Sequence, residues 1–252
     1  MNKTETCKEI VFRSDEFLLK GTLHLPAVTR PPVVIGSHGL FSTGNSPKQI
    51  ALAQECTRRG IAFFRFDHRG CGESQGVFHD VTSLESRCRD LICAVETILS
   101  GRDTGNAAAF FGSSMGGAVC MATAGTSFKE AVSIVTVSAP VCISSHNEAM
   151  KAIRKSADSY LPEPLFYERN LEFDLSGLLP ALRNILIFHG DKDEVIPVSE
   201  AMKIYRNAGH PKKLVIQKQG DHRMSSEEHQ REFIASAVNW FEAGFLLSGD
   251  RK

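Results

Sequence analysis

The sequence contains no long hydrophobic run. None of its apolar stretches approaches the roughly 20 residues of a membrane-spanning helix, and Met1 to Lys8 is polar, without the apolar core of a signal peptide. Its charges balance as well, because 29 lysines and arginines stand against 29 aspartates and glutamates. Nucleic acids and anionic membrane surfaces attract an excess of basic side chains. We therefore expect neither nucleic acid nor a membrane among the partners.

Patterns that hold disulfides, metals or phosphates are missing too. The seven cysteines are scattered, odd in number and free of C-x-x-C pairs, which favours buried, reduced thiols and a cytoplasmic location. His68, His79 and Asp80 lack a recognised metal-ligand spacing. No lysine follows the glycines between Gly112 and Gly117 in Walker spacing, so they do not form a phosphate loop. We predict no metal and no cofactor.

The sequence does contain a regular alternation of short apolar runs and amphipathic segments. Such alternation predicts an α/β protein with a mainly parallel sheet covered by helices on both faces, and 252 residues suit one such domain. The first two runs read as an antiparallel hairpin. We expect strands at residues 9–13, 17–25, 33–35, 61–66, 107–111, 132–137, 185–188 and 213–217. We expect helices at residues 47–59, 80–100, 115–124, 199–207 and 225–241.

One segment interrupts this alternation. About residues 141–184 mix helical stretches with prolines and aromatic residues, and an insertion of that length is usually functional. We interpret it as a small cap over the edge of the sheet, inserted into a single domain that spans residues 1–252.

The most informative stretch is Gly112-Ser113-Ser114-Met115-Gly116, a Gly-x-Ser-x-Gly motif between a buried strand and a buried helix. A strand that turns directly into a helix crowds its own backbone, so only hydrogen fits at Gly112 and Gly116. Ser114 at the apex would present a strained, exposed hydroxyl, as in the nucleophile elbow of serine hydrolases.

A serine nucleophile needs a base, and the base needs an orienting carboxylate. In this arrangement both follow the serine, each in a loop at the carboxyl end of a later strand. His222 follows the last strand and is the candidate base, because His210 precedes that strand and His229 falls within the final helix. The loop after the strand at 185–188 offers three carboxylates that spacing alone does not separate: Asp191, Asp193 and Glu194.

From the opening hairpin to the last helix, the chain resembles the α/β-hydrolase superfamily of serine hydrolases. The nearest groups are the small cinnamoyl (feruloyl) esterase-like and serine-aminopeptidase-like enzymes. The matching pieces are His38-Gly39-Leu40, the run from Asp67 to Ser74, the elbow, the run from His189 to Pro197, and Gly220-Asp221-His222. The resemblance implies an α/β-hydrolase fold with a mostly parallel, eight-stranded sheet. It also implies that Asp193 is the acid of the triad, with Asp191 supporting the loop.

The intermediate of acyl transfer carries an oxyanion that needs hydrogen-bond donors. We expect the backbone N–H groups of Met115 and Leu40 to supply them, with Phe41 as the neighbouring candidate. His38, Asp67 and Arg69 are interpreted as residues that brace their loops. Candidates for the substrate pocket are aromatic: Phe41, Tyr160, Phe166 and Tyr167.

These observations predict a serine hydrolase that cleaves small carboxylic esters through an acyl-enzyme, using Ser114, His222 and Asp193. Thioester, amide or short-peptide hydrolysis on the same triad is the alternative, and a non-catalytic binding protein of this fold is a rival. Two features depart from the esterases that the chain resembles: the insertion is short, and Arg223 stands where an apolar residue is frequent. No hydroxycinnamate preference is therefore predicted, and assembly into a homodimer is left open.

Overall fold

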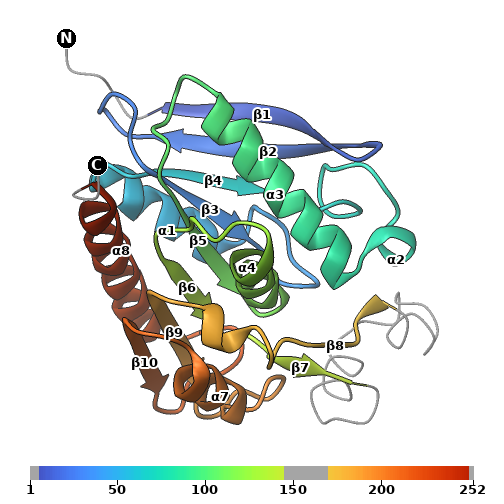
Figure 1. The fold of residues 1–252 in the computed structure, drawn as a ribbon, viewed down its shortest axis with the longest axis vertical. Coiled ribbons are helices and arrows are strands. Elements are labelled where there is room, and N and C mark those ends of the chain that lie inside the picture. The colour runs from blue at the N-terminus through green and yellow to red at the C-terminus, as the bar shows by residue number, and fades with distance from the viewer. Residues whose placement is uncertain (1–5, 145–169, 250–252) are drawn as a thin grey trace.

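The structure is a computed structural model that describes residues 6–144 and 170–249. Eight strands form one twisted sheet in the order β1-β2-β4-β3-β5-β6-β9-β10, with helices on both sides (Figure 1). The strands of this sheet are β1 Thr6–Ser14, β2 Phe17–Leu25, β3 Val33–Ser37, β4 Ala62–Phe66, β5 Ala108–Ser113, β6 Ile134–Val137, β9 Ile185–Gly190 and β10 Lys212–Gln217. The predicted eight-stranded α/β fold is confirmed.

The direction of the strands decides where a site can form. β1 and β2 make the antiparallel hairpin, and β2 also runs antiparallel to β4. The pairs β3–β4, β3–β5, β5–β6, β6–β9 and β9–β10 are all parallel. Because parallel strands end at the same edge, the loops that follow β3, β5, β9 and β10 gather there, where α/β proteins place their sites.

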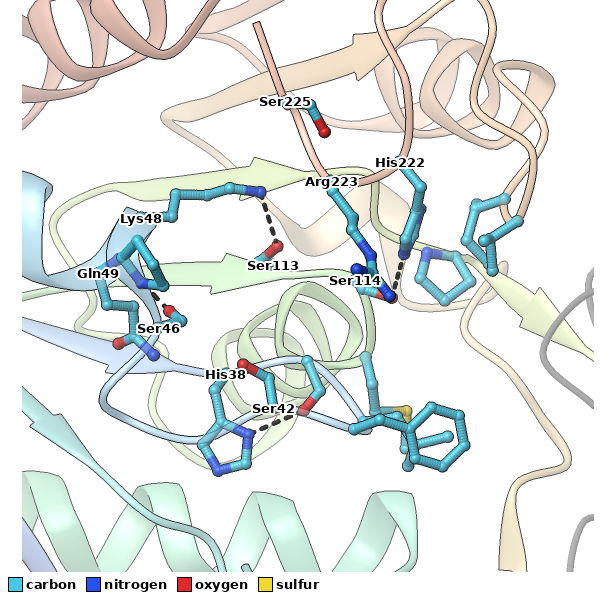
Figure 2. A pocket seen from close by; sticks show the side chains of 18 of the residues that line it. His38, Ser42, Ser46, Lys48, Gln49, Ser113, Ser114, His222, Arg223 and Ser225 are labelled. Atoms are coloured by element: carbon cyan, nitrogen blue, oxygen red, sulfur yellow. Dashed lines mark hydrogen bonds between the residues drawn. The ribbon is translucent and has the colours of Figure 1, made fainter. Parts of the chain in front are cut away.

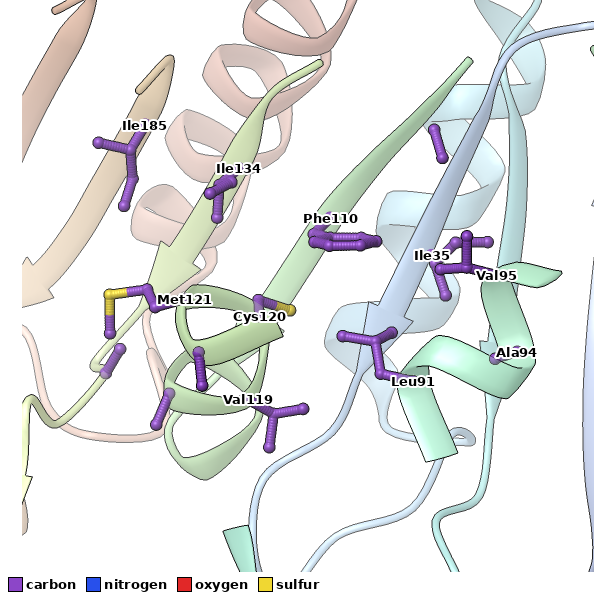
Figure 3. Close-up of a cluster of buried hydrophobic side chains, with 14 of the residues drawn as sticks. Ile35, Leu91, Ala94, Val95, Phe110, Val119, Cys120, Met121, Ile134 and Ile185 are labelled. Carbon is purple, nitrogen blue, oxygen red and sulfur yellow. The ribbon is translucent and has the colours of Figure 1, made fainter. Parts of the chain in front are cut away.

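The helices are α1 Pro47–Arg58, α2 Phe78–Val81, α3 Leu84–Ser100, α4 Met115–Thr126, α7 Ser199–Asn207 and α8 Glu227–Gly249, with a 3-10 turn at Leu179–Ala181. One face of the sheet packs against α3, α4 and α7, and its buried side chains include Leu91, Phe110 and Val119 (Figure 3). The other face packs against α1 and α8, through side chains such as Leu52 and Phe233. The central strands are therefore buried on both faces, which explains their unbroken apolar sequences.

The single helix predicted over residues 80–100 is wrong at its start. The chain forms the short helix α2, leaves helical geometry at Thr82, and restarts at Leu84 as α3. Ser83 caps α3, because its hydroxyl accepts from the Ser86 N–H and its own N–H donates to the Ser86 hydroxyl. This reciprocal cap satisfies N–H donors that are free at the start of a helix, so α3 begins here. The spacing of apolar residues did not indicate this start.

The two described ends of the insertion meet beside the sheet. β7 (Cys142–Ile143) pairs antiparallel with β8 (Phe173–Asp174). Leu171, Leu175 and Leu179 are buried against the main domain. Residues 145–169 lie outside the described part of the chain, so the predicted cap and the single-domain assignment stay predictions.

Candidate active site

Ser114 stands in a strained turn at the end of β5 and the start of α4. Its backbone has φ 54° and ψ −123°, a conformation that residues other than glycine rarely adopt. A side chain at Gly112 would run into the backbone of Gly116 and Gly117, and one at Gly116 would run into the carbonyl oxygen of Ser37. Glycine is thus required at both positions, for the reason expected from the sequence.

Three side chains from three loops meet at this turn. His222 Nε2 lies 3.1 Å from Ser114 Oγ (Figure 2). His222 Nδ1 lies 2.9 Å from each carboxylate oxygen of Asp193. An ionised carboxylate only accepts, so the proton of the neutral imidazole is on Nδ1 and Nε2 is left to accept from the serine hydroxyl. The structure therefore brings together the serine, histidine and aspartate singled out from the sequence.

The three carboxylates of the β9 loop have different partners. Asp193 alone of the three contacts His222 Nδ1. Asp191 Oδ1 accepts from the Gln219 N–H and so ties this loop to the next, while Glu194 Oε2 accepts from the backbone N–H of His222. These contacts distinguish the three carboxylates, which their spacing in the sequence did not. The contact between Asp191 and Gln219 agrees with the loop-supporting role that the resemblance implied for Asp191.

Asp193 is built to stay ionised. Its side chain is buried, which by itself disfavours the charge, but hydrogen bonds from His189, His222 and the Ile196 N–H outweigh burial and hold its pKa well below the usual range. The Val195 N–H also donates to Oδ1, at 2.9 Å. A permanent negative charge at this point faces His222 Nδ1 and holds the imidazole in one orientation.

The two competing histidines lie elsewhere. His210 precedes β10, at the end of that strand opposite to the loop carrying His222. His229 lies in α8, where its backbone carbonyl accepts from Gln217. Within the described residues neither histidine contacts Ser114 or Asp193, consistent with their exclusion from the sequence order.

The backbone N–H groups expected to stabilise the oxyanion lie in the turn after β3 and at the start of α4. Gly39 packs directly on the elbow: a Cβ added there would lie 3.6 Å from the Cβ of Ser114. Among the described residues, the backbone N–H groups of Leu40, Phe41 and Met115 donate to no protein acceptor. Free N–H groups on both sides of Ser114 are what an oxyanion requires. The geometry does not choose between Leu40 and its neighbour Phe41.

Sequence reasoning missed the residue that holds this turn. Arg87 of α3 is completely buried, and its guanidinium donates to three successive carbonyls, those of His38, Gly39 and Leu40, at 3.4, 3.3 and 3.0 Å. Burial lowers the pKa of Arg87. Because the ordinary pKa of an arginine is very high, the side chain stays charged at neutral pH. Arg87 thereby holds the backbone of the turn that packs on Ser114.

A second buried polar group lies beneath the turn. His38 Nε2 accepts from the His68 N–H, so its Nδ1–H donates to the Gly39 carbonyl at 2.8 Å. Burial, together with His68 and Arg87, holds the pKa of His38 well below its usual value, so the ring is neutral. His38 has both nitrogens occupied by backbone groups, as expected of a bracing residue.

Asp90 is the anchor of this network and was also missed. It accepts from the His68 Nδ1–H at 3.3 Å and from the backbone and guanidinium N–H groups of Arg69 at 2.7 to 3.0 Å. Burial opposes its charge, but His68 and Arg69 lower its pKa far below the usual value. Arg69 also donates to the side chains of Ser14 and Asp15 in the β1–β2 hairpin, so it connects Asp90 with the edge of the sheet.

Asp67 braces two further loops. Its carboxylate accepts from the Gly44 N–H at 2.7 Å and from the Glu73 N–H at 2.9 Å. Gly72 must be glycine here, because a side chain would collide with the Asp67 carboxylate and because its φ is positive. The bracing role expected for Asp67 and Arg69 agrees with these contacts.

A cavity of about 840 Å³ opens in front of Ser114 and His222. Phe41 lines it and is 45% exposed. Tyr160, Phe166 and Tyr167, the other aromatic candidates, lie outside the described residues. The described lining includes Leu40, Met115, Ile143, Leu171 and Ile196, which form one buried apolar cluster. It also has polar members near α1, among them Ser46, Lys48 and Gln49 (Figure 2).

Within 6–144 and 170–249, no three or more histidine, cysteine, aspartate or glutamate side chains converge as a metal ion would require. No helix in those same ranges is long and apolar enough to cross a membrane.

The fold and the strained serine turn together define an α/β-hydrolase. A sequence profile of the family described as serine aminopeptidase, S33, matches residues 30–176. The chain therefore belongs to this family of hydrolases. The matched range contains Ser114 but ends before Asp193 and His222, so those two assignments depend on the geometry described above.

Proteins with similar sequences include one named as a thioesterase and one named as uncharacterised. The chain is 24% identical over 217 residues to mouse palmitoyl-protein thioesterase ABHD10, mitochondrial, covering 79% of this chain and 71% of the relative. It is 28% identical over 225 residues to the uncharacterised protein YfhR of Escherichia coli O157:H7, covering 88% and 72%.

Solved structures with this fold include esterases. Est1E of Butyrivibrio proteoclasticus, solved with ferulic acid, superposes with a TM-score of 0.76 at 17% identity, covering 94% of this chain and 99% of Est1E. The Pyrococcus furiosus esterase Pf2001 gives a TM-score of 0.76 at 18% identity, covering 95% and 93%. At such identities the likeness establishes the fold, and it confirms the predicted resemblance to α/β-hydrolase esterases.

Proposed function

We propose that the protein hydrolyses small carboxylic esters through a covalent acyl-enzyme formed on Ser114. One observation carries the proposal: Ser114 Oγ, His222 and Asp193 form an unbroken chain of contacts of 3.1 and 2.9 Å at the edge of a cavity. A protein that only binds its ligand needs neither a base on the serine nor a carboxylate on the base. Acyl transfer requires both, and the contacts among these three residues support it.

In the first half-reaction Ser114 Oγ attacks the carbonyl carbon of the ester while His222 Nε2 takes the hydroxyl proton. Asp193 holds the imidazole with its proton on Nδ1 and stabilises the imidazolium that forms. The N–H groups of Met115 and Leu40 stabilise the oxyanion. When the tetrahedral intermediate collapses, the alcohol leaves with the proton from His222 and the acyl group stays on Ser114.

In the second half-reaction water replaces the alcohol. His222 Nε2 takes a proton from water, and the resulting hydroxide attacks the acyl carbon on Ser114. Collapse of the second intermediate releases the carboxylic acid and returns the proton to Ser114 Oγ. No step requires a metal or a cofactor.

Turnover of p-nitrophenyl butyrate tests the proposal. We expect hydrolysis by the wild type and a loss of at least about 1,000-fold in kcat for Ser114→Ala. Ser113→Ala is the matched control, because it removes the neighbouring hydroxyl, and it should keep most of the activity. No hydrolysis by the wild type, or equal losses in both variants, would contradict the proposal.

Thioester hydrolysis is the second candidate. It is favoured by the relatives named as palmitoyl-protein thioesterases, and the same triad and oxyanion donors would serve it. Butyryl-coenzyme A and p-nitrophenyl butyrate, compared by kcat/KM, separate the two candidates. A cytoplasmic location, a homodimer and a small-molecule partner remain predictions of the sequence alone.

A further inference from the structure

Lys48 places a cation inside the cavity of the proposed active site. It is the second residue of α1, directly after Pro47, and its ammonium points into the cavity toward Ser113 (Figure 2). Nζ lies 3.4 Å from the Ser113 hydroxyl, on the residue immediately before the proposed nucleophile. The proposed mechanism makes no use of this charge.

This ammonium is poorly satisfied by the protein. Within the described residues, no carboxylate lies within ion-pairing distance of it, and a single hydroxyl is its hydrogen-bond partner. Burial lowers the pKa of Lys48 to about 8, although Asp221 and Asp193 act in the opposite direction. At neutral pH the group therefore carries its charge on a side chain that is only partly exposed to solvent. A buried charge without a partner is unfavourable, and such groups are concentrated at binding sites.

Neighbouring groups favour an anion at the same place. Arg223 lines the cavity, and it has no carboxylate partner among the described residues. Gln49 lines it as well, is 1% exposed, and has neither amide atom paired within the described part of the chain. Lys48 and Gln49 lie in the first turn of α1, whose N-terminal dipole also favours negative charge. Of the described lining residues, Glu194 alone carries a carboxylate, and it accepts from the His222 N–H.

We propose that Lys48, assisted by Arg223, binds an anionic group of the substrate, so that the preferred substrate is an ester that also carries a carboxylate. The inference rests on the proposed ester hydrolysis, and it adds the chemical class of the substrate. The apolar cluster around Leu40 and Ile143 borders the same cavity and would take an uncharged part of the molecule. Recognition by a partly buried ammonium gives a strong, charge-assisted contact that a neutral ester cannot make.

The test compares anionic esters with neutral esters of the same shape. On the acyl side, the p-nitrophenyl monoester of glutaric acid is compared with the same compound methylated on its free carboxylate. On the leaving-group side, 4-(butyryloxy)benzoate is compared with its methyl ester. The quantity measured is the ratio of kcat/KM for the anionic ester to that for its neutral partner, in wild type, Lys48→Met, Lys48→Arg and Lys8→Met.

We expect a ratio of about 10 or more in the wild type for at least one pair, falling to about 1 in Lys48→Met. Lys48→Arg keeps the charge and should retain most of the ratio. Lys8 pairs with Asp103 at the surface, so Lys8→Met removes one positive charge outside the cavity and should keep the wild-type ratio. A ratio below 1 for both pairs in the wild type, or an unchanged ratio in Lys48→Met, would overturn the proposal.

Binding measurements separate this proposal from the proposed chemistry. Glutaryl p-nitroanilide is titrated calorimetrically into Ser114→Ala and into the double variant Ser114→Ala, Lys48→Met. About tenfold weaker binding by the double variant supports the anion subsite even if the wild type hydrolyses no ester. Equal affinity in the two proteins, or no binding by Ser114→Ala, counts against the subsite even if neutral esters are hydrolysed.

Discussion

Arg87 Nη2 donates a hydrogen bond of 3.0 Å to the backbone carbonyl of Leu40, the residue whose N–H is proposed to stabilise the oxyanion. A peptide unit is planar, so fixing the carbonyls of this turn also fixes the direction of the N–H groups that follow them. Arg87 thus connects α3, which packs on one face of the sheet, with the turn that is proposed to bind the oxyanion at the edge of the sheet. It is a positioning residue, since it acts through the turn and does not reach the serine.

Replacing Arg87 should therefore damage turnover more than substrate binding. In Arg87→Met three carbonyls lose their charged donor, although that of Gly39 still accepts from His38 Nδ1–H. We expect kcat to fall about 100-fold with little change in KM, because the oxyanion exists only after attack. Arg87→Lys restores one charged donor and should recover part of kcat. Steady-state kinetics on p-nitrophenyl butyrate, with circular dichroism as a check on folding, provide the test. A raised KM with unchanged kcat would show that the turn binds substrate instead.

The acid of the triad can be tested against its neighbour in the same loop. Asp193→Asn replaces an acceptor with an amide that can no longer hold the proton on His222 Nδ1, so kcat should fall at least about 1,000-fold. Asp191→Asn keeps a side-chain oxygen for the Gln219 N–H and should stay within about tenfold of the wild type. The two variants are compared by kcat at neutral pH. A larger loss in Asp191→Asn would exchange the two roles.

His222 can be distinguished from the other histidines in the same way. His222→Ala removes the group 3.1 Å from Ser114 Oγ, and kcat should fall by several orders of magnitude. His210→Ala and His229→Ala change residues that contact neither Ser114 nor Asp193 in the described chain, so kcat should stay near that of the wild type. A comparable loss in His210→Ala, in a protein that remains folded, would refute the assignment of the base.

Much of this architecture could be predicted from the sequence because its signals are local. Gly-x-Ser-x-Gly between two apolar runs defines the elbow, and the order of strands places His222 in a loop from which it contacts Ser114. No local signal shows which of Asp191, Asp193 and Glu194 contacts the histidine, because the contact reaches from the loop after β9 to the loop after β10. In the sequence, only the family resemblance pointed to Asp193.

The network beneath the site was missed although the sequence held a signal. Arg87 lies three residues after Leu84 and four before Leu91, which places it on the buried side of an amphipathic helix. Asp90 lies three residues after Arg87 and four before the buried Ala94, so it falls on the same side. A charge on an apolar face is buried only with partners. Those partners, such as His68 and the carbonyl of Leu40, come from distant parts of the chain and cannot be identified from helical periodicity.

Asp90 should make the stability of the protein sensitive to acid. Its pKa in the folded state is lowered far below the value of about 3.9 in an unfolded chain, so the unfolded state takes up the proton first as the pH falls. The stabilisation is present at neutral pH, begins to be lost as the pH falls through about 5, and continues to be lost below about pH 3 until Asp90 is protonated in the folded state as well. In Asp90→Asn the free energy of unfolding, measured with urea, should be lower at pH 7. Its slope with pH between 3 and 5 should be smaller by up to about 1.4 kcal/mol per pH unit. An unchanged slope would contradict this account.

Covalent labelling of the serine tests the central claim most directly. A fluorophosphonate probe reacts with a serine only where a base activates it and an oxyanion site receives the phosphonyl oxygen. Digestion and mass spectrometry of the labelled wild type should locate the adduct on Ser114, with no label in Ser114→Ala and greatly reduced labelling in His222→Ala. Wild-type protein that is folded but unlabelled, or labelled at Ser113 instead of Ser114, would contradict the account.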